Sequence, residues 1–429
     1  MSTLNIGTSE MRCGFCGKSQ LEARKLVEGV SAYICDRCAR LCNQVLDDDE
    51  KRELATIPRT VEIPKPSDLM AMLNQHVVGQ DLAKKILSVA VHNHLKRISS
   101  EDRGDAGAVK LQKSNVLLIG PTGSGKTLLT ETLAGFLKVP FTIADATKLT
   151  EAGYVGEDVE SVLTGLLQAA DFDVARAERG IVYIDEVDKL SRKSEGPSLT
   201  RDISGEGVQQ ALLKVLEGSI VSVPMKRGRK GAQQETVQVN TSKILFICGG
   251  AFVGLERVIE ARRKKVSMGI GAPLKVVGSE NLHGALHQVE NGDLLRFGMI
   301  PEMLGRLPVI ATLDPLHEND LVQILTEPRN SIVKQYQRLF ELENVRLRFS
   351  EEALKAIARE ALASNTGARG LRSIIETRML DVMYQIPSNP DVAECVIEEG
   401  VITRRESPKL VMRATYSEPP AAVASQGKR

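Results

Sequence analysis

A glycine-rich stretch at residues 115–127, NVLLIGPTGSGKT, combines the residue types that bind phosphate. Glycines let backbone N–H groups converge on phosphate oxygens, and a helix that begins near Lys126 would add its positive end to the same anion. Lys126 can reach the β- and γ-phosphates, while the hydroxyl of Thr127 suits Mg²⁺. We therefore predict a nucleoside triphosphate site formed by Gly120, Pro121, Thr122, Gly123, Ser124, Gly125, Lys126 and Thr127.

Two adjacent carboxylates follow a second apolar run, within IVYIDEVDKL at residues 181–190. Asp185 would hold Mg²⁺ through water beside Thr127, and Glu186 would orient and deprotonate the attacking water. A protein that only senses the nucleotide would not need Glu186. The pair therefore favours hydrolysis over simple binding.

Two Cys-x-x-Cys pairs near the amino terminus are separated by eighteen residues, the spacing of a zinc ribbon or treble-clef site. Four thiolates close a tetrahedral site and leave no position for a substrate, so the metal should be structural and should drive folding of this small module. Disulfides are the competing interpretation, but they are rare in the cytoplasm. We expect Cys42 to be a bystander. The predicted Zn²⁺ ligands are Cys13, Cys16, Cys35 and Cys38.

The elements that must position these groups alternate between apolar runs and helical patterns. This alternation predicts an α/β domain with a parallel sheet. A helix is expected at 205–218, followed by a hairpin that carries Lys226, Arg227, Arg229 and Lys230. The expected strands are 115–119, 141–145, the start of 181–190, 243–248 and 308–313.

The second half of the chain changes character. Residues 249–300 show no strong periodicity, which suggests a functional loop. Beyond Asp314-Pro315 the pattern is mostly helical, and we predict helices at 318–340, 350–363 and 369–384. The histidines in the helical patterns before the phosphate loop are expected to be satisfied or exposed rather than metal ligands; they are His76, His92 and His94.

Length and composition limit the function further. A chain of 429 residues exceeds what one hydrophobic core usually holds, so two or three domains are expected. A net charge of +1, 3% aromatic residues and no Trp argue against a nucleic-acid or membrane surface as the main partner. No signal-peptide pattern or membrane-spanning apolar run is visible, so a cytoplasmic location is expected.

Composition also suggests the domain boundaries. An acidic run and then Pro58, Pro64 and Pro66 indicate a linker after the cysteine module, and the end of the chain is rich in Pro, Ala and Ser. We predict a zinc-binding domain at 1–50, a linker at 51–66, a large ATPase domain at 67–315, a small domain at 316–406 and a disordered tail at 407–429.

Several strings together give the chain a family likeness: CxxC…CxxC, GPTGSGKT, GYVG, IVYIDEVDK, SGEGVQQALLK, KILFICGGAF, GRLP and TGARGLRS. In this order they closely resemble the ClpX family of ring-forming AAA+ protein unfoldases, the ATP-binding subunits of Clp proteases. The resemblance covers nearly everything from Met11 to about Ser407. It is specific, because other AAA+ proteins share the phosphate loop and the Asp-Glu strand but not the remaining strings together.

The resemblance implies an AAA+ P-loop domain, a mostly helical small domain and a treble-clef-like zinc domain. It also implies a homohexamer with ATP between neighbours, a zinc domain that dimerises and receives substrates and adaptors, and a ClpP-type peptidase partner. Such proteins unfold substrates for the peptidase and act as chaperones on their own.

The resemblance also implies roles for individual residues. Val77 and Val78 would flank adenine, Arg306 would be the arginine finger that reaches a neighbour's γ-phosphate, and Arg369 would sense the nucleotide from the small domain. The loop that grips substrate in the axial pore would be Gly153, Tyr154, Val155 and Gly156.

Two positions depart from the family pattern. The pore-entrance loop usually reads Arg-Lys-His, whereas this chain has Arg229-Lys230-Gly231. The loop that docks on the peptidase usually carries Ile- or Leu-Gly-Phe, whereas the aligned tripeptide is Met268, Gly269 and Ile270. These two departures concern degron choice and peptidase docking.

Two other function classes remain as alternatives. The first is a AAA+ nucleic-acid remodeller that uses the zinc module and the basic hairpin. The aromatic–aliphatic pore loop and the near-neutral charge favour polypeptide instead, since a loop that moves DNA should carry Lys or Arg at its tip. The second is a nucleotide switch without hydrolysis, against which Glu186 and Arg306 argue.

Overall fold

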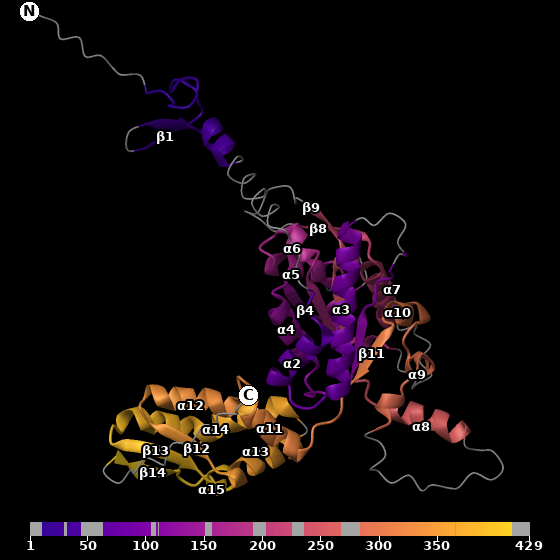
Figure 1. Cartoon of the computed structure of the whole chain (residues 1–429), viewed down its shortest axis with the longest axis vertical. Coiled ribbons are helices and arrows are strands. Elements are labelled where there is room, and N and C mark those ends of the chain that lie inside the picture. The colour runs from indigo at the N-terminus through magenta and orange to yellow at the C-terminus, as the bar shows by residue number, and fades with distance from the viewer. Residues whose placement is uncertain are drawn as a thin grey trace, which may run out of the picture. The chain divides into compact units, whose positions relative to one another are not determined.

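The computed structural model divides the chain into two compact units, Met1–Glu62 and Ile63–Arg429 (Figure 1). The residues that it describes are 11–29, 32–43, 63–103, 109, 111–150, 157–191, 203–224, 236–266, 284–364 and 366–413. None of the helices in these ranges is long and apolar enough to cross a membrane.

The first unit is a small hairpin followed by a helix. Strands β1 (Leu26–Glu28) and β2 (Tyr33–Cys35) pair antiparallel, and residues 36–43 are helical. In the described part of this unit, Cys13 and Cys35 are the only buried hydrophobic residues. So few buried side chains cannot offset the loss of chain entropy, and another source of stability is needed.

A five-stranded parallel sheet forms the centre of the second unit, in the order β11-β3-β10-β7-β4. All five predicted strands are confirmed within a few residues. They are β3 (Val116–Ile119), β4 (Phe141–Asp145), β7 (Ile181–Asp185), β10 (Leu245–Gly250) and β11 (Val309–Thr312).

Alternate residues of these strands enter two different cores. Val116 and Leu118 pack with α2 (Pro66–His76), α3 (Asp81–Arg103) and α4 (Lys126–Leu137). Leu117 and Ile119 enter the opposite core, which the helices α5 (Ser161–Ala169), α7 (Ile203–Glu217), α8 (Leu255–Val266), α9 (Asn291–Phe297) and α10 (Pro301–Arg306) share. The sheet is therefore covered by helices on both faces.

Short elements complete this part of the unit. The expected hairpin is present as β8 (Ile220–Pro224) and β9 (Thr236–Asn240), which pair antiparallel. The others are η1 (Ala146–Lys148), β5 (Leu149–Thr150), β6 (Glu157–Asp158), α6 (Val174–Ala177), η2 (Val187–Leu190), η3 (Thr241–Lys243) and η5 (Leu286–Gln288).

The expectation of an uncommitted loop at 249–300 is wrong for the described residues, because α8 and α9 lie there. Helix α8 is mostly charged, and its apolar positions Leu255 and Ile259 give only a short buried stripe. Arg262 of α8 donates to the fully buried carboxylate of Asp293 in α9 at 3.0 Å. A long-range ion pair of this kind leaves no periodic signal in the sequence.

The C-terminal elements have a core of their own and are drawn in orange and yellow in Figure 1. The predicted helix at 318–340 is wrong in one respect: it is two helices. Pro328, which has no N–H for a helical hydrogen bond, separates them, and Ser331 caps the second. The helices are α11 (Glu318–Thr326), α12 (Ile332–Leu342), α13 (Glu351–Ala363), α14 (Ala368–Gln385), η6 (Ile386–Ser388) and α15 (Glu399–Thr403).

A three-stranded sheet accompanies these helices, and the sequence patterns did not indicate it. Its strands are β12 (Arg346–Phe349), β13 (Val392–Ile397) and β14 (Lys409–Met412), in that order. β12 pairs parallel with β13, and β14 pairs antiparallel with β13. The segment is mostly helical, as expected, with this small sheet added.

Candidate nucleotide and zinc sites

The predicted nucleotide residues follow β3 and β7, at the carboxyl ends of the parallel strands. In open α/β sheets this edge is where ligands bind. β3 leads into the phosphate loop, and β7 ends at Asp185. The loop turns through Gly123 and Gly125, whose φ angles of +80° and +102° disfavour any residue with a Cβ. The fold therefore places both sequence patterns at one edge.

Lys126 begins α4 and turns back over the phosphate loop. Its Nζ donates to the carbonyls of Gly120 at 2.6 Å and Pro121 at 2.9 Å. Burial lowers the pKa of Lys126, while the charges of Asp185 and Asp188 oppose that shift. A buried ammonium at a helix N-terminus is suited to an anion with several charges, such as a triphosphate.

Thr127 and Asp185 lie together although 58 residues separate them in the chain. The Thr127 hydroxyl donates to the Asp185 carboxylate at 3.4 Å. A hydroxyl beside a carboxylate is an oxygen donor set that suits Mg²⁺, so these residues fit the predicted ion. A bound Mg²⁺ would supply positive charge to the phosphate oxygens.

Glu186 is exposed at the same edge and has an unusual backbone conformation. Its φ is +59°, which a residue with a side chain rarely adopts. Its N–H donates to the Asp185 carboxylate at 2.9 Å, which helps to hold this turn. Strain of this kind persists where the surroundings enforce it, and it is common at functional sites.

Two residues that the sequence analysis did not single out support these carboxylates. The fully buried Tyr183 donates its hydroxyl to Asp185 at 3.1 Å. Asp188, which is 6% exposed, accepts from the backbone N–H groups of Ala251 at 3.1 Å and Phe252 at 3.2 Å. The sequence offered one signal for Asp188: it is an acidic residue that directly follows the Asp185-Glu186 pair and Val187.

Val77 and Val78 lie in the elbow between α2 and α3, beside the phosphate loop. Val77 is buried, and a Cβ added to Gly125 would lie 3.9 Å from its Cγ1. Gln80 fixes the elbow, because its side-chain amide donates to the carbonyl of Asp314 and accepts from the N–H of Asp314, both at 2.8 Å. The elbow is thereby tied to the chain that follows β11.

A groove of about 920 Å³ lies between α2, α4 and the α11–α12 connection. Residues immediately before Val77, Gln75 and His76, line one side of it, and Leu128 and Ile324 contribute apolar surface. The Gln75 carbonyl accepts from the N–H of Arg329 at 3.0 Å and so connects α2 to the α11–α12 segment.

Arg369, at the start of α14, lies in a segment that packs close to the phosphate loop as well. A Cβ added to Gly123 would lie 3.0 Å from the carbonyl oxygen of Thr366 and 3.2 Å from Cα of Gly367, so the chain before α14 packs against the loop. The positive charge of Arg369 also contributes to the lowered pKa of Lys126, after burial and the opposing carboxylates. The predicted sensor and the phosphate loop therefore lie in one neighbourhood.

The four predicted metal ligands in the first unit come together. The Sγ atoms of Cys13, Cys16, Cys35 and Cys38 all lie within 4.8 Å of one another. Tetrahedral Zn–S bonds of about 2.3 Å would place the sulfurs about 3.8 Å apart, so the cluster fits this ion. All of these cysteines, and Cys42 outside the cluster, are free thiols.

The thiol of Cys13 has a lower pKa than an ordinary cysteine. Burial acts to raise the pKa of Cys13, but hydrogen bonds from the backbone N–H groups of Cys16, Cys35 and Phe15 outweigh it and hold the pKa at about 6. The N–H of Cys35 donates to Sγ of Cys13 at 3.2 Å. A thiolate is the form that binds a metal.

Comparison with known protein families identifies each part of the chain. Residues 11–48 match the ClpX C4-type zinc finger, and residues 111–310 match the AAA domain of the Cdc48 subfamily. Residues 316–397 match the C-terminal, D2-small domain of ClpB protein. The chain belongs to the ClpX-type AAA+ proteins. The family and the fold expected from the sequence are thus confirmed: an AAA ATPase domain, a small domain and a four-cysteine zinc finger.

In this ClpX-type chain, Arg306 is the predicted site residue that is not drawn into the nucleotide site of its own subunit. It ends α10 and is about half exposed, and its guanidinium pairs with Glu217 of α7 at 2.6 and 3.0 Å. Its role as an arginine finger stays a prediction.

The two remaining predicted loops lie outside the described residues. Gly153, Tyr154, Val155 and Gly156 fall between β5 and β6, which pair parallel. Met268, Gly269 and Ile270 follow the end of α8. Their roles stay predictions that rest on the ClpX resemblance.

Proposed function

We propose that the chain is an ATP-dependent protein unfoldase and the specificity component of a Clp protease. The observation that carries the proposal is the ClpX C4-type zinc finger joined in one chain to an AAA domain. As a homohexamer, it would recognise, unfold and translocate proteins through a ring pore into a ClpP-type peptidase. It would also act as a chaperone without the peptidase, in the cytoplasm.

ATP hydrolysis would use the carboxyl edge of the large sheet. Lys126 and the phosphate-loop N–H groups would hold the phosphates, and Thr127 with Asp185 would hold Mg²⁺. Glu186, exposed next to Asp185, would take the proton of the attacking water. Val77 and Val78 would flank the adenine, and Arg369 would contact the phosphates from the small domain.

Assembly would complete the site. We propose that Arg306 acts on the nucleotide of a neighbouring subunit, which agrees with its half-exposed position away from the Lys126 site of its own chain. A finger supplied by a neighbour makes hydrolysis depend on the ring, because such arginines contribute roughly 10³–10⁵ in rate.

Other segments of the chain would bind the substrate and the peptidase. Tyr154 and Val155 would grip the polypeptide in the pore, and the zinc domain would receive substrates and adaptors. Met268, Gly269 and Ile270 would dock on the peptidase. The sequence shows no protease nucleophile motif, so peptide hydrolysis is assigned to the partner.

The test compares the activators of ATP hydrolysis. Unfolded protein and double-stranded DNA are titrated side by side at several salt concentrations. We expect unfolded protein to stimulate hydrolysis with a weak dependence on salt, whereas contacts to phosphates weaken steeply as salt rises. Stimulation by DNA alone, lost at high salt, would favour the nucleic-acid remodeller instead.

A further inference from the structure

The hydroxyl of Tyr183 is the polar end of a side chain that otherwise lies in an apolar core. Tyr183 is fully buried in the middle of β7, and its ring belongs to the core that includes Leu129 and Leu133 of α4. The phenol oxygen reaches the carboxyl edge of the sheet, where it donates to Oδ1 of Asp185 at 3.1 Å. A phenylalanine would fill this core with the same ring, so the hydroxyl needs an explanation of its own.

Gly249 in the neighbouring strand leaves the space that the hydroxyl occupies. β10 pairs parallel with β7, and a Cβ added to Gly249 would lie 2.7 Å from Cζ of Tyr183 and 2.9 Å from its Cε2, and closer still to the hydroxyl oxygen. A rigid ring cannot bend away from such a contact. Gly249 does not adopt a positive φ, so the space rather than the backbone conformation requires glycine here. Two strands therefore combine to place one hydroxyl.

The two oxygens of the Asp185 carboxylate have different surroundings. Oδ1 accepts from the Tyr183 hydroxyl at 3.1 Å and from the backbone N–H of Glu186 at 2.9 Å. In the described part of the chain, Oδ2 has only the contact with the Thr127 hydroxyl at 3.4 Å, which is long for an O–H···O hydrogen bond. The chain thus holds Oδ1 twice and leaves Oδ2 as the oxygen that is available to a cation.

Tyr183 is not needed to satisfy Asp185 in the absence of a ligand. The carboxylate is partly exposed, so water could bind Oδ1 as well. Water molecules rearrange, whereas a phenol fixed within a buried strand does not. The hydrogen bond from Tyr183 therefore supplies orientation. Partners of this kind, which hold a metal-binding carboxylate from behind, typically contribute 10- to 100-fold in metal affinity or activity.

We propose that Tyr183, seated against Gly249, is a positioning residue that turns Oδ2 of Asp185 toward Mg²⁺ beside Thr127. The proposal deepens the proposed ATPase site and rests on it. Oδ1 also receives the N–H of Glu186, whose φ is +59°. By fixing this oxygen, Tyr183 also helps to hold the turn that presents the proposed base.

The test replaces Tyr183 by Phe, which keeps the ring and removes the donor. Binding of the slowly hydrolysed analogue ATPγS to the full-length protein is measured by calorimetry, once with excess Mg²⁺ and once with EDTA. With Mg²⁺ the Kd should rise roughly 10-fold or more. With EDTA it should stay at the parent value, because the phosphate loop and Lys126 are unchanged. The melting temperature in EDTA should also stay near that of the parent, since the core retains its ring.

Two further variants sharpen the test. Gly249→Ala keeps the phenol but pushes it away from Asp185, so it should show the same selective loss of affinity with Mg²⁺. Tyr336→Phe is the matched control, because it removes the hydroxyl of another buried tyrosine, in the core of the C-terminal elements. It should leave both dissociation constants at the parent level.

The outcomes are separable. An unchanged Kd with Mg²⁺ in Tyr183→Phe would overturn the proposal. Equal weakening with Mg²⁺ and with EDTA, together with a lower melting temperature, would show a purely structural role and overturn it as well. If the parent binds no ATPγS, the proposed ATPase site itself fails. A parent that binds ATPγS equally well with and without Mg²⁺ would keep the nucleotide site but overturn the positioning of Mg²⁺ by Tyr183.

Discussion

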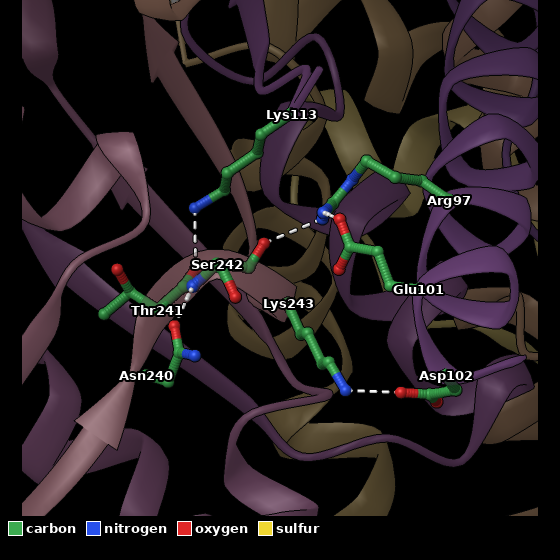
Figure 2. Close-up of polar contacts among 8 residues, drawn as sticks. All are labelled: Arg97, Glu101, Asp102, Lys113, Asn240, Thr241, Ser242 and Lys243. Carbon is green, nitrogen blue, oxygen red and sulfur yellow. Dashed lines mark hydrogen bonds and ion pairs between the residues drawn. The ribbon is translucent and has the colours of Figure 1, made fainter. Parts of the chain in front are cut away.

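The two ends of the central sheet carry polar groups of opposite kinds. At the carboxyl end, Glu186 is exposed and Asp185 is half-buried, with hydroxyl groups of Thr127 and Tyr183 beside them. At the amino end, Arg97 is buried, and Arg97 and Lys113 bind backbone carbonyls of the same chain (Figure 2). One end is therefore open to a ligand, whereas the buried basic groups at the other end bind carbonyls of their own chain.

The two ends of the sheet therefore have different roles: one binds a ligand, and the other holds the chain in place. Carboxylates at the open end interact with a ligand only when it is bound. Without the ligand they can remain partly exposed to water. Basic groups at the closed end are desolvated, and their cost is offset by hydrogen bonds. Variants at the open end should therefore change chemistry, whereas variants at the closed end should change geometry and pH dependence.

The largest effect is expected from Arg306→Ala. Loss of an arginine finger should lower ATP hydrolysis by roughly 10³-fold or more, with ATP binding retained. The check is steady-state hydrolysis by homogeneous rings and by rings that mix Arg306→Ala with Glu186→Gln subunits. If the finger acts on a neighbour as proposed, mixed rings should regain activity. If they are no more active than either variant alone, the assignment in trans is wrong.

Glu186→Gln should have the next largest effect. The variant keeps Lys126, Thr127 and Asp185 but loses the base, so hydrolysis should fall by roughly 10²–10⁴-fold while ATP still binds. The matched control is Glu178→Gln at the amino end, where the side chain accepts from the N–H of Asn240 at 2.8 Å and Gln can accept as well. The control should hydrolyse ATP at the parent rate; a Glu186→Gln protein that does the same would remove the role of the base.

A smaller effect should appear in the pH dependence of stability at the closed end. Burial lowers the pKa of His94 to about 3 from 6.5, so the unfolded chain binds a proton between these values that the folded chain does not. Stability should therefore be complete above pH 6.5 and fall as the pH decreases, by up to about 1.4 kcal/mol per pH unit.

His94→Gln should flatten this fall, since the side chain can still donate but does not titrate. The measurement is the melting temperature of parent and variant between pH 5 and pH 7.5. Parallel curves for the two proteins would show that His94 does not contribute a buried neutral imidazole.

The smallest change in hydrolysis is expected from Cys13→Ser, because Cys13 belongs to the first unit and the sheet to the second. Zinc binding should be lost or greatly weakened and the first unit should unfold, because the metal supplies most of its stability. Basal hydrolysis should stay within about twofold of the parent, since the unit is compact by itself. Metal analysis of protein prepared without chelator and an ATPase assay decide this; absence of zinc from the parent would end the hypothesis.

The open end of the sheet and the cysteine cluster of the first unit could be predicted from the sequence because their chemistry is local. The phosphate loop, the Asp185-Glu186 pair and the paired cysteines are each defined by short spacings, and strands adjacent to them are strongly apolar. The closed end could not be predicted in this way. Lys113 and Thr241 are 128 residues apart, and a side chain that binds a backbone carbonyl leaves no pattern.

The same reasoning explains the other gaps. Pro328 divides a helix that periodicity alone extended to residue 340. β12 and β14 are only four residues long, and the six residues of β13 do not alternate between polar and apolar. Tyr154 and Arg306 were assigned by family resemblance. Their functional roles stay predictions.

The most direct test of the account concerns Tyr154. A loop that pulls chains of any sequence needs apolar bulk, and in the proposed pore loop Gly153 and Gly156 would allow it to swing as the nucleotide state changes. ATP hydrolysis, unfolding of a stably folded tagged protein and melting temperature are measured on one preparation of Tyr154→Ala. We predict that hydrolysis is retained or faster and the melting temperature is unchanged, while unfolding slows severely. Parallel loss of all three would make Tyr154 a core residue, and unfolding at the parent rate would contradict a pore that grips polypeptide.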